Sequence, residues 1–243
     1  MDFQEYNSTE LWPGGLRIIK NGKVFPLGMD AVLLASFAGQ IPARRVCDLG
    51  CGSGIIALLL LKNDGQKTAL GIEIQKEAVD TARINTGLNS MSGRFAVIQG
   101  DLRDFRTICK PGKFDLTVSN PPYFPEKSGK PPAAEGMAVA RGERFCTLSD
   151  ICVAAAYVTR FGGKFAMVQR PERLSEALCE LTTAGLEPKR LRMVQQGVYS
   201  EPCLFLLECR RGGKRGIKIE PPLILKDENG QDTIEIKDIY HLT

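Results

Sequence analysis

The chain has 243 residues, of which 43% are hydrophobic and 25% are charged, and its formal net charge is +4 at pH 7. This length allows one domain with a sizeable core and a small appendage. The apolar runs, including residues 55–61, are far shorter than the roughly 20 residues that span a bilayer, and the polar first ten residues do not resemble a signal peptide. We therefore expect a cytoplasmic protein with no membrane partner.

Cysteine and histidine restrict the chemistry further. Eight cysteines are scattered along the chain without a CxxC pair, which favours reduced, partly buried thiols. The chain has a single histidine, His241, close to its C-terminus. This excludes His-based catalytic triads and most His-rich metal sites, so we expect no metal.

The first forty residues predict an extension to the main domain. Residues 16–27 hold two short apolar runs around Asn21-Gly22, which is the strongest short hairpin signal. Residues 29–39 predict a helix with Asp30 as its N-cap and Gly39 at its end. We assign residues 1–40 to a hairpin and helix extension and residues 41–243 to the main domain.

From Arg45 onward, strands alternate with helices. The predicted strands are residues 45–50, 68–74, 94–100, 113–119, 164–169, 190–196 and 202–210, and the predicted helices are residues 54–63, 75–89, 147–163 and 171–185. This alternation indicates right-handed βαβ units around a parallel sheet that helices cover on both faces. The last two strands are too close for a crossover, so that pair should be antiparallel. A further hairpin is expected around residues 227–230.

The predicted fold is therefore an open, doubly wound α/β sheet with one antiparallel strand near its edge. Such sheets bind ligands beyond the carboxyl ends of their strands. The first strand ends in "DLGCGSG", residues 48–54, whose glycines allow a sharp turn and close approach of a ligand. The spacing differs from the dinucleotide fingerprint, and the carboxylate of Asp48 suits an ammonium or sulfonium group better than a pyrophosphate.

Polar residues also follow the next three strands. Glu73 ends the second strand, where a carboxylate can hold a ribose diol. Asp101 follows the third strand and could accept from an exocyclic amine, although capping of a short helix at residues 102–105 explains it equally well. The fourth strand ends in Asn120-Pro121-Pro122-Tyr123.

On these motifs the chain resembles the class I S-adenosylmethionine-dependent methyltransferases, from about Arg45 to the C-terminus. The family has a Rossmann-like sheet of seven strands with one antiparallel strand. The resemblance implies S-adenosylmethionine as cofactor, with Asp48 and the following glycines at its methionine end, Glu73 on the ribose and Asp101 on the adenine amine. The implied cofactor contacts are Met29, Asp30, Asp48, Gly50, Cys51, Gly52, Glu73, Ile74, Asp101, Leu102 and Asn120.

The "NPPY" motif has a physical explanation of its own. An exocyclic amine conjugated to a ring is a poor nucleophile, and two acceptors on its N–H groups free its lone pair. The Asn120 side-chain oxygen and the Pro121 carbonyl can be these acceptors, with Pro122 restricting the backbone. Tyr123 can stack on the base, a contact worth roughly 1–3 kcal/mol. These four residues are the predicted catalytic set.

Three substrates fit such a motif: adenine N6 or cytosine N4 in nucleic acid, and a glutamine amide in protein. The stretch from Phe25 to Leu34, "NPPYF" and the sequence "ARGE" from Ala140 to Glu143 make the chain similar to the bacterial tRNA1(Val) adenine-N6 methyltransferase family, whose members modify the adenine 3′ of the anticodon. The resemblance implies tRNA modification, and RNA contacts are expected from Phe124, Lys127, Lys130, Arg141 and Arg144. The alternatives are a release-factor glutamine-N5 methyltransferase, an rRNA adenine-N6 methyltransferase and a non-catalytic RNA-binding module.

The basic run from Arg210 to Lys218 holds five cations and no acid. A solvated turn and a phosphate contact explain it about equally well.

Overall fold

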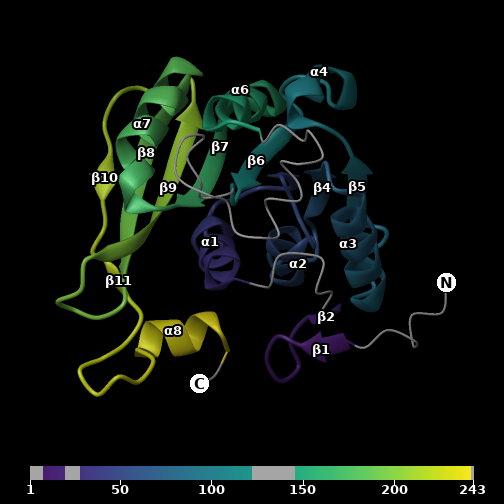
Figure 1. Ribbon diagram of the computed structural model, residues 1–243. Coiled ribbons are helices and arrows are strands. Elements are labelled where there is room, and N and C mark those ends of the chain that lie inside the picture. Colours follow the sequence, from purple (N-terminus) through teal and green to yellow (C-terminus); the bar gives the residue numbers. More distant parts are fainter. Residues whose placement is uncertain (1–7, 20–27, 122–145, 242–243) are drawn as a thin grey trace, which may run out of the picture.

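A mixed β-sheet runs through the centre of the computed structural model, which describes residues 8–19, 28–121 and 146–241 (Figure 1). Its main strands are β3 (Arg45–Leu49), β4 (Thr68–Glu73), β5 (Phe95–Gln99), β6 (Phe114–Ser119), β7 (Thr159–Gln169), β8 (Leu186–Gln195) and β9 (Pro202–Arg211). They lie in the order β8-β9-β7-β6-β3-β4-β5. Strand β9 is antiparallel to both β7 and β8, and β3 to β7 pair in parallel. This confirms the predicted doubly wound sheet with its antiparallel strand near one edge.

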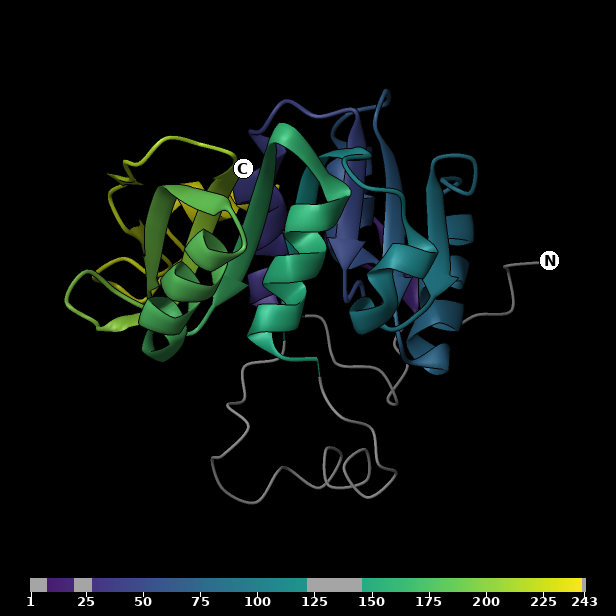
Figure 2. The same ribbon diagram turned by 90° about the horizontal axis from the view of Figure 1, so that it is seen from above.

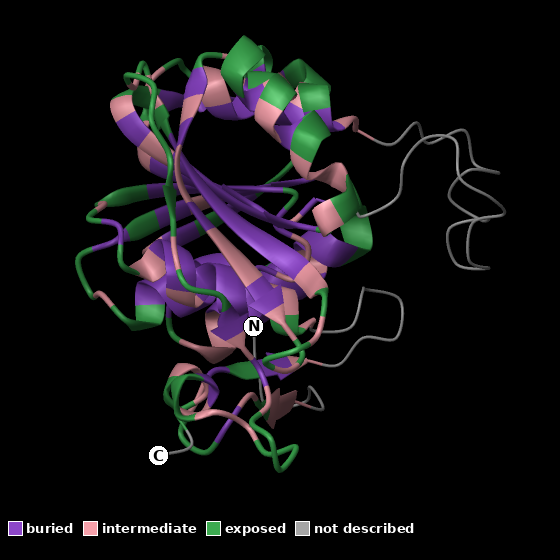
Figure 3. Ribbon diagram, turned by 90° about the vertical axis from the view of Figure 1, so that its left-hand side faces the viewer, coloured by how far each residue is buried: buried purple, intermediate pink, exposed green. Residues whose placement is uncertain are grey.

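Helices cover both faces of the sheet (Figures 1 and 3). Those below it in Figure 1 are α1 (Met29–Gly39), α2 (Ile55–Lys62) and α3 (Lys76–Leu88), and those above it are α4 (Phe105–Ile108), α6 (Leu148–Val158) and α7 (Leu174–Thr183). Side chains alternate between the two cores: on β7, Ala166 and Val168 face the α1 side while Phe165 and Met167 face the α6 side. Each face of the sheet thus has its own apolar core.

Helix α2 explains why the run from Ile55 to Leu61 is apolar on every side. All seven of these residues are buried, because α2 packs between β3 and β4 of the sheet and α1. A helix that is apolar all round must be covered all round. Helix α1, with Leu34 and Ala38 fully buried, supplies the outer cover. This interior position accounts for an unbroken apolar run that is too short to span a membrane.

Two predicted elements were wrong. Residues 159–163 do not continue α6 but begin β7, because Thr159 pairs with Phe114 at the start of β6 and Gly162 adopts a left-handed φ of 74°. Strands β10 (Lys218–Ile219) and β11 (Leu223–Ile224) pair in parallel with β8. The hairpin expected around residues 227–230, which follows them in the chain, has only a single antiparallel bridge. Its second arm is instead the helix α8 (Ile234–Ile239), capped by Thr233.

The described N-terminal residues form a hairpin, and the expected one around Asn21-Gly22 stays a prediction. Strands β1 (Ser8–Glu10) and β2 (Arg17–Ile19) pair around residues 11–16, whereas Asn21-Gly22 lies outside the described residues. The N-cap of α1 is Gly28 and not Asp30, whose carboxylate lies in the first turn and folds back over Gly28. The boundary at residue 40 stays a prediction.

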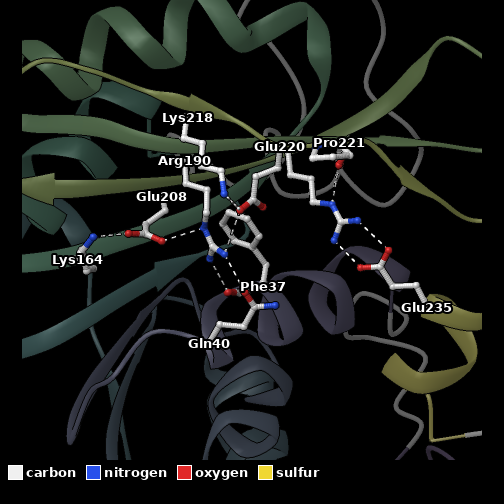
Figure 4. Close-up of polar contacts among 10 residues, drawn as sticks. Phe37, Gln40, Lys164, Arg190, Glu208, Lys218, Glu220, Pro221 and Glu235 are labelled. Atoms are coloured by element: carbon white, nitrogen blue, oxygen red, sulfur yellow. Dashed lines mark hydrogen bonds and ion pairs between the residues drawn. The ribbon is translucent and has the colours of Figure 1, made fainter.

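The guanidinium of Arg190 joins the antiparallel edge of the sheet to α1 (Figure 4). It pairs with Glu208 of β9 at 3.0 Å, donates to the Gln40 side chain at 2.8 Å and to the Phe37 carbonyl at 2.9 Å, and stacks on the Phe37 ring. Glu208, only 7% exposed, also pairs with Lys164. Beside this cluster, Arg192 forms a bidentate ion pair with Glu235 of α8.

We expect Arg190→Met to destabilise the fold by roughly 2–4 kcal/mol, because it removes one partner of the buried Glu208 carboxylate. Urea denaturation measures this loss. The exposed pair of Arg83 and Asp80 provides a control, since Arg83→Met should cost less than about 1 kcal/mol. Adding Glu208→Gln to Arg190→Met should recover part of the loss, and equal losses for Arg190→Met and Arg83→Met would contradict this account.

Candidate active site

Four predicted site residues converge at one edge of the sheet. Asp48 lies in β3, Glu73 ends β4, and Asp101 and Asn120 follow β5 and β6. These four strands are adjacent and parallel, so their carboxyl ends meet at the same edge. The structure therefore brings together residues that are up to 72 positions apart in the chain.

A glycine loop connects β3 to α2 at this edge. Gly50, Gly52 and Gly54 all have left-handed φ angles of 70°, 52° and 82°. A Cβ added to Gly50 or Gly52 would meet nothing within 4 Å, whereas one on Gly54 would lie 2.8 Å from the Phe95 ring. The first two glycines thus leave open space beside the loop, and the third is required by packing.

The carboxyl group of Asp48 is fully buried below this loop. Neither of its oxygens has a hydrogen-bond partner within the described residues. Burial raises its pKa from 3.8 to about 7; the nearby Ala57 backbone N–H, outside hydrogen-bonding geometry, lowers it in part, and the Glu73 carboxylate raises it further. A cation placed at the loop would favour the ionised form.

Glu73 is also buried, but it is fixed by the backbone. Its Oε2 accepts from the Gly52 N–H at 3.0 Å and its Oε1 from the Gln75 N–H at 2.9 Å. Each carboxylate oxygen can accept more than one hydrogen bond. The side chain is therefore held in one orientation and keeps acceptor capacity for a diol.

Asp101 caps the short helix η2 (Leu102–Asp104), as one of its two interpretations predicts. It accepts from the Arg103 backbone N–H at 2.9 Å and forms an ion pair with the Arg103 guanidinium, which lowers its pKa although partial burial acts in the opposite direction. Leu102 is buried in the α6-side core, while Ile74 is 47% exposed after β4. Contacts of these residues with an adenine ring stay predictions.

Asn120 faces the N-terminus of α1. Its Nδ2 donates to Oδ2 of Asp30 at 3.5 Å, which turns its Oδ1 away from that carboxylate. The end of β6 is held to β3 by Ser119, whose hydroxyl donates to the Leu49 carbonyl at 2.8 Å. Pro121 is buried beside Asn120.

Two other predicted cofactor contacts, Met29 and Cys51, differ in their exposure. Met29 is 37% exposed at the start of α1, whereas Cys51 is buried with its Sγ against Gly71 and so points into the core. The predicted residues outside the described part of the chain are Pro122, Tyr123, Phe124, Lys127, Lys130, Arg141 and Arg144. The roles of all these residues stay predictions.

The residues at this edge fit S-adenosylmethionine. The buried Asp48 carboxylate has no protein partner in the described chain, and open space lies beside Gly50 and Gly52. Asp48 and these glycines would hold the cationic methionine end of the cofactor, and Glu73 the ribose hydroxyls.

Sequence reasoning missed two asparagines, Asn85 of α3 and Asn89 at its C-cap. Asn85 is fully buried, accepts from the Ile19 backbone N–H at 2.9 Å and donates to the Ser53 carbonyl at 3.0 Å. Asn89 exchanges two hydrogen bonds with the backbone of Arg17. Asn85 thereby joins the N-terminal hairpin to the glycine loop. Two Asn residues four apart on an amphipathic helix were the available signal.

Two kinds of feature are missing from the described part of the chain. It holds no cluster of three or more His, Cys, Asp or Glu side chains that could bind a metal ion. It also holds no helix with the length and hydrophobicity needed to cross a membrane.

Comparisons with known proteins identify relatives of this chain. The family model of the methyltransferase small domain matches residues 28–172. A tRNA1(Val) (adenine(37)-N6)-methyltransferase of Porphyromonas gingivalis is 32% identical over 199 residues, covering 79% of this chain and 77% of that protein. A protein of the same name from Tolumonas auensis is 36% identical over 160 residues, covering 65% of each.

Solved structures share the fold. One described as a predicted O-methyltransferase from Agrobacterium tumefaciens has a TM-score of 0.72 at 19% identity and covers 88% of this chain and 96% of its own. Geranyl diphosphate C-methyltransferase from Streptomyces coelicolor, solved with S-adenosyl-L-homocysteine, has a TM-score of 0.55 at 12% identity, with coverages of 74% and 76%.

We expect Asp48→Asn to stabilise the ligand-free protein at pH 8. A carboxyl with a folded pKa of about 7 and an unfolded pKa of about 3.9 ionises first in the unfolded chain, so stability falls as pH rises between these values. The gain at pH 8 has an upper bound on the order of 4 kcal/mol, and it should shrink steadily towards pH 5. Urea denaturation at both pH values measures it.

Calorimetry with S-adenosylhomocysteine supplies the second measurement for this variant. Asp48→Asn should weaken binding because the ligand's ammonium group loses its carboxylate partner. A variant that is less stable than the parent at pH 8, or a difference that does not change with pH, would contradict the assignment of a desolvated Asp48.

Proposed function

The chain belongs to the methyltransferase small domain family, together with the tRNA1(Val) (adenine(37)-N6)-methyltransferases, and from this we propose that it methylates the N6 amine of an adenine in tRNA. The adenine just 3′ of the anticodon of tRNA(Val) is the proposed target, as the names of its relatives indicate. The observation that supports this most directly is the position of Asn120 at the carboxyl edge, beside Asp30 and next to the glycine loop's strand. We place the enzyme in the cytoplasm, where tRNA is its partner.

The proposed chemistry depends on position more than on proton transfer. S-adenosylmethionine supplies an electrophilic sulfonium methyl group when bound. The side chains of Asp48 and Glu73 would hold its methionine end and its ribose, on either side of the sulfonium, and so fix where the methyl group lies. Holding two reactants in the correct geometry can supply much of the acceleration, which suits a chain with a single histidine.

Asn120 and Pro121 are the proposed acceptors for the target amine. Because the Asn120 amide nitrogen donates to Asp30, its oxygen is the atom directed elsewhere, and we assign it to one N6–H. The Pro121 carbonyl is assigned to the other. Two acceptors draw electron density out of the conjugated system and onto the nitrogen, while Tyr123 is proposed to stack on the ring.

The substrate base has to leave its stack to reach this edge. Single-stranded loops present unstacked bases at low cost, so a loop adenine fits better than a base in a duplex. Contacts from Phe124, Lys127, Lys130, Arg141 and Arg144 are proposed to hold the surrounding RNA. The proposed catalytic domain is residues 41–243, with residues 1–40 as its extension.

We expect Asn120→Ala to lower turnover by on the order of 10²–10³-fold, a range typical of removing one preorganised polar contact to the reacting group. Binding of S-adenosylhomocysteine, measured by calorimetry, should stay near the parent value. Asp30→Ala keeps the Asn120 amide but removes the carboxylate that orients it. Its turnover should therefore fall between that of the parent and that of Asn120→Ala. Undiminished turnover in Asn120→Ala would rule out the proposed activation of the amine.

Methyl transfer from labelled S-adenosylmethionine tests the substrate class. We expect label in total tRNA, recovered as N6-methyladenosine, and none in a release factor or in rRNA. Label in protein alone would instead support a glutamine-N5 methyltransferase, label in rRNA alone an rRNA enzyme, and failure to bind cofactor a non-catalytic RNA-binding module.

A further inference from the structure

A second charged surface lies at the opposite edge of the sheet, where β3, β6 and β7 begin. Strand β9 runs in the opposite direction, so Arg210 near its end lies opposite Lys164 of β7 and Glu187 of β8 in the strand register. This places the basic run after β9 far from Asn120, at the upper edge of Figure 2, where α6 leads into β7. We define the amino-edge basic surface as Arg44, Arg45, Arg160, Phe161, Arg210, Lys214 and Arg215, all exposed.

The balance of charge on this surface is strongly positive. It holds six cations, and two acids, Asp115 and Glu187, lie beside it. Asp115 accepts from the backbone N–H groups of Arg44 and Arg45 and from Nε of Arg160 at 2.8 Å, so most of its capacity is already used.

Two guanidinium groups, those of Arg160 and Arg210, both approach Gly162 at the centre of the surface. A Cβ added to Gly162 would lie 3.5 Å from Nη2 of Arg210 and 3.9 Å from Nη1 of Arg160. Within the described residues, the Arg210 side chain makes no hydrogen bond and no ion pair. Two neighbouring guanidinium groups repel each other, and a phosphate between them would relieve this repulsion and accept directed hydrogen bonds from both.

The rest of the surface is ordered by contacts of its own. Nζ of Lys189 donates to the carbonyls of Lys214 and Gly216 at 2.9 and 2.5 Å, and the Gly212 N–H donates to the Gly185 carbonyl at 3.1 Å. Lys214 and Arg215 thus project from a fixed loop. This favours a preformed binding surface over a solvated turn.

An aromatic ring lies within the same surface. Phe161 is 77% exposed although its ring covers Gly212, where an added Cβ would lie 2.1 Å from it. An exposed ring among cations is the combination with which proteins hold nucleic-acid backbones and bases. A purely electrostatic surface for an acidic protein would not need the ring.

We propose that the amino-edge basic surface binds the phosphate backbone of the tRNA at a point remote from the methylated base. The identity of the RNA rests on the proposed function. Strand β6 runs from one edge of the sheet to the other with six residues, and at roughly 3.3 Å per residue the two edges are about 20 Å apart. An RNA that contacts both edges must also pass around the protein between them, so we assign the remote contact to the body of the tRNA.

Comparison of full-length tRNA with its isolated anticodon stem-loop tests this proposal. The variant is Arg210→Gln with Arg215→Gln, and the matched control is Lys76→Gln with Arg83→Gln on the exposed side of α3. For full-length tRNA we expect roughly tenfold weaker binding at physiological salt. The slope of log K against the logarithm of the salt concentration should be smaller in magnitude by about 1–2. Methylation of the stem-loop and binding of S-adenosylhomocysteine should stay at parent values, as should all properties of the control.

Several results would overturn the proposal. Unchanged affinity and salt slope on full-length tRNA would show that the surface does not bind RNA, and equal losses on both RNAs would show that the contact is not remote. A second variant, Lys214→Gln with Arg215→Gln, removes only exposed loop charges and should weaken tRNA binding in the same way. If the parent protein methylates neither RNA, the proposed function fails, while the binding comparison still decides the surface.

Discussion

Parallel pairing of β3 with β4 on one side and β6 on the other is the constraint on which the candidate site depends. In this register Asp48 lies opposite both Gly71 and Val118, so the ends of three strands lie level with one another. Hydrogen bonds along the strands and the two apolar cores fix this register, because a shift by one residue would exchange the faces of every side chain. The polar residues at the edge are positioned by packing far from them.

The same register places a charge where water cannot reach it. Asp48 is buried without a partner in the described chain, and the neighbouring carboxylate of Glu73 adds to the unfavourable electrostatics. Glu73 itself is stabilised by the backbone N–H groups of Gly52 and Gln75. Such a site is less stable without a cation than with one, and strained or unpaired groups of this kind concentrate at functional sites. The unpaired Asp48 carboxylate therefore lowers the stability of the ligand-free protein, whereas in its proposed role it raises the affinity for the cofactor.

Charge is divided between the two edges of the sheet. Acidic side chains gather at the carboxyl edge, where Asp30, Asp48, Glu73 and Asp101 suit a cationic cofactor. The amino edge carries the excess of arginine and lysine. A polyanion would be attracted to the second edge. The antiparallel direction of β9 produces this division, because it carries the basic run after Arg210 away from the site.

The sequence alone determined the type of fold and the edge of the sheet at which the candidate site lies. Alternating strand and helix patterns predicted the sheet, and "DLGCGSG", Glu73 and "NPPY" located the edge where the site lies, because glycine turns and strand-terminal acids are local signals. It did not determine the junction at Thr159 or the helix at Ile234, since pairing with β6 and packing against α1 override local preference there. Only the tertiary structure decided that Asn85 joins the hairpin to Ser53 of the glycine loop, that Asp30 contacts Asn120, and that Arg160 and Arg210 both approach Gly162. These pairs are 32, 90 and 50 residues apart in the chain, and their contacts arise from strand order and direction, which no local pattern encodes.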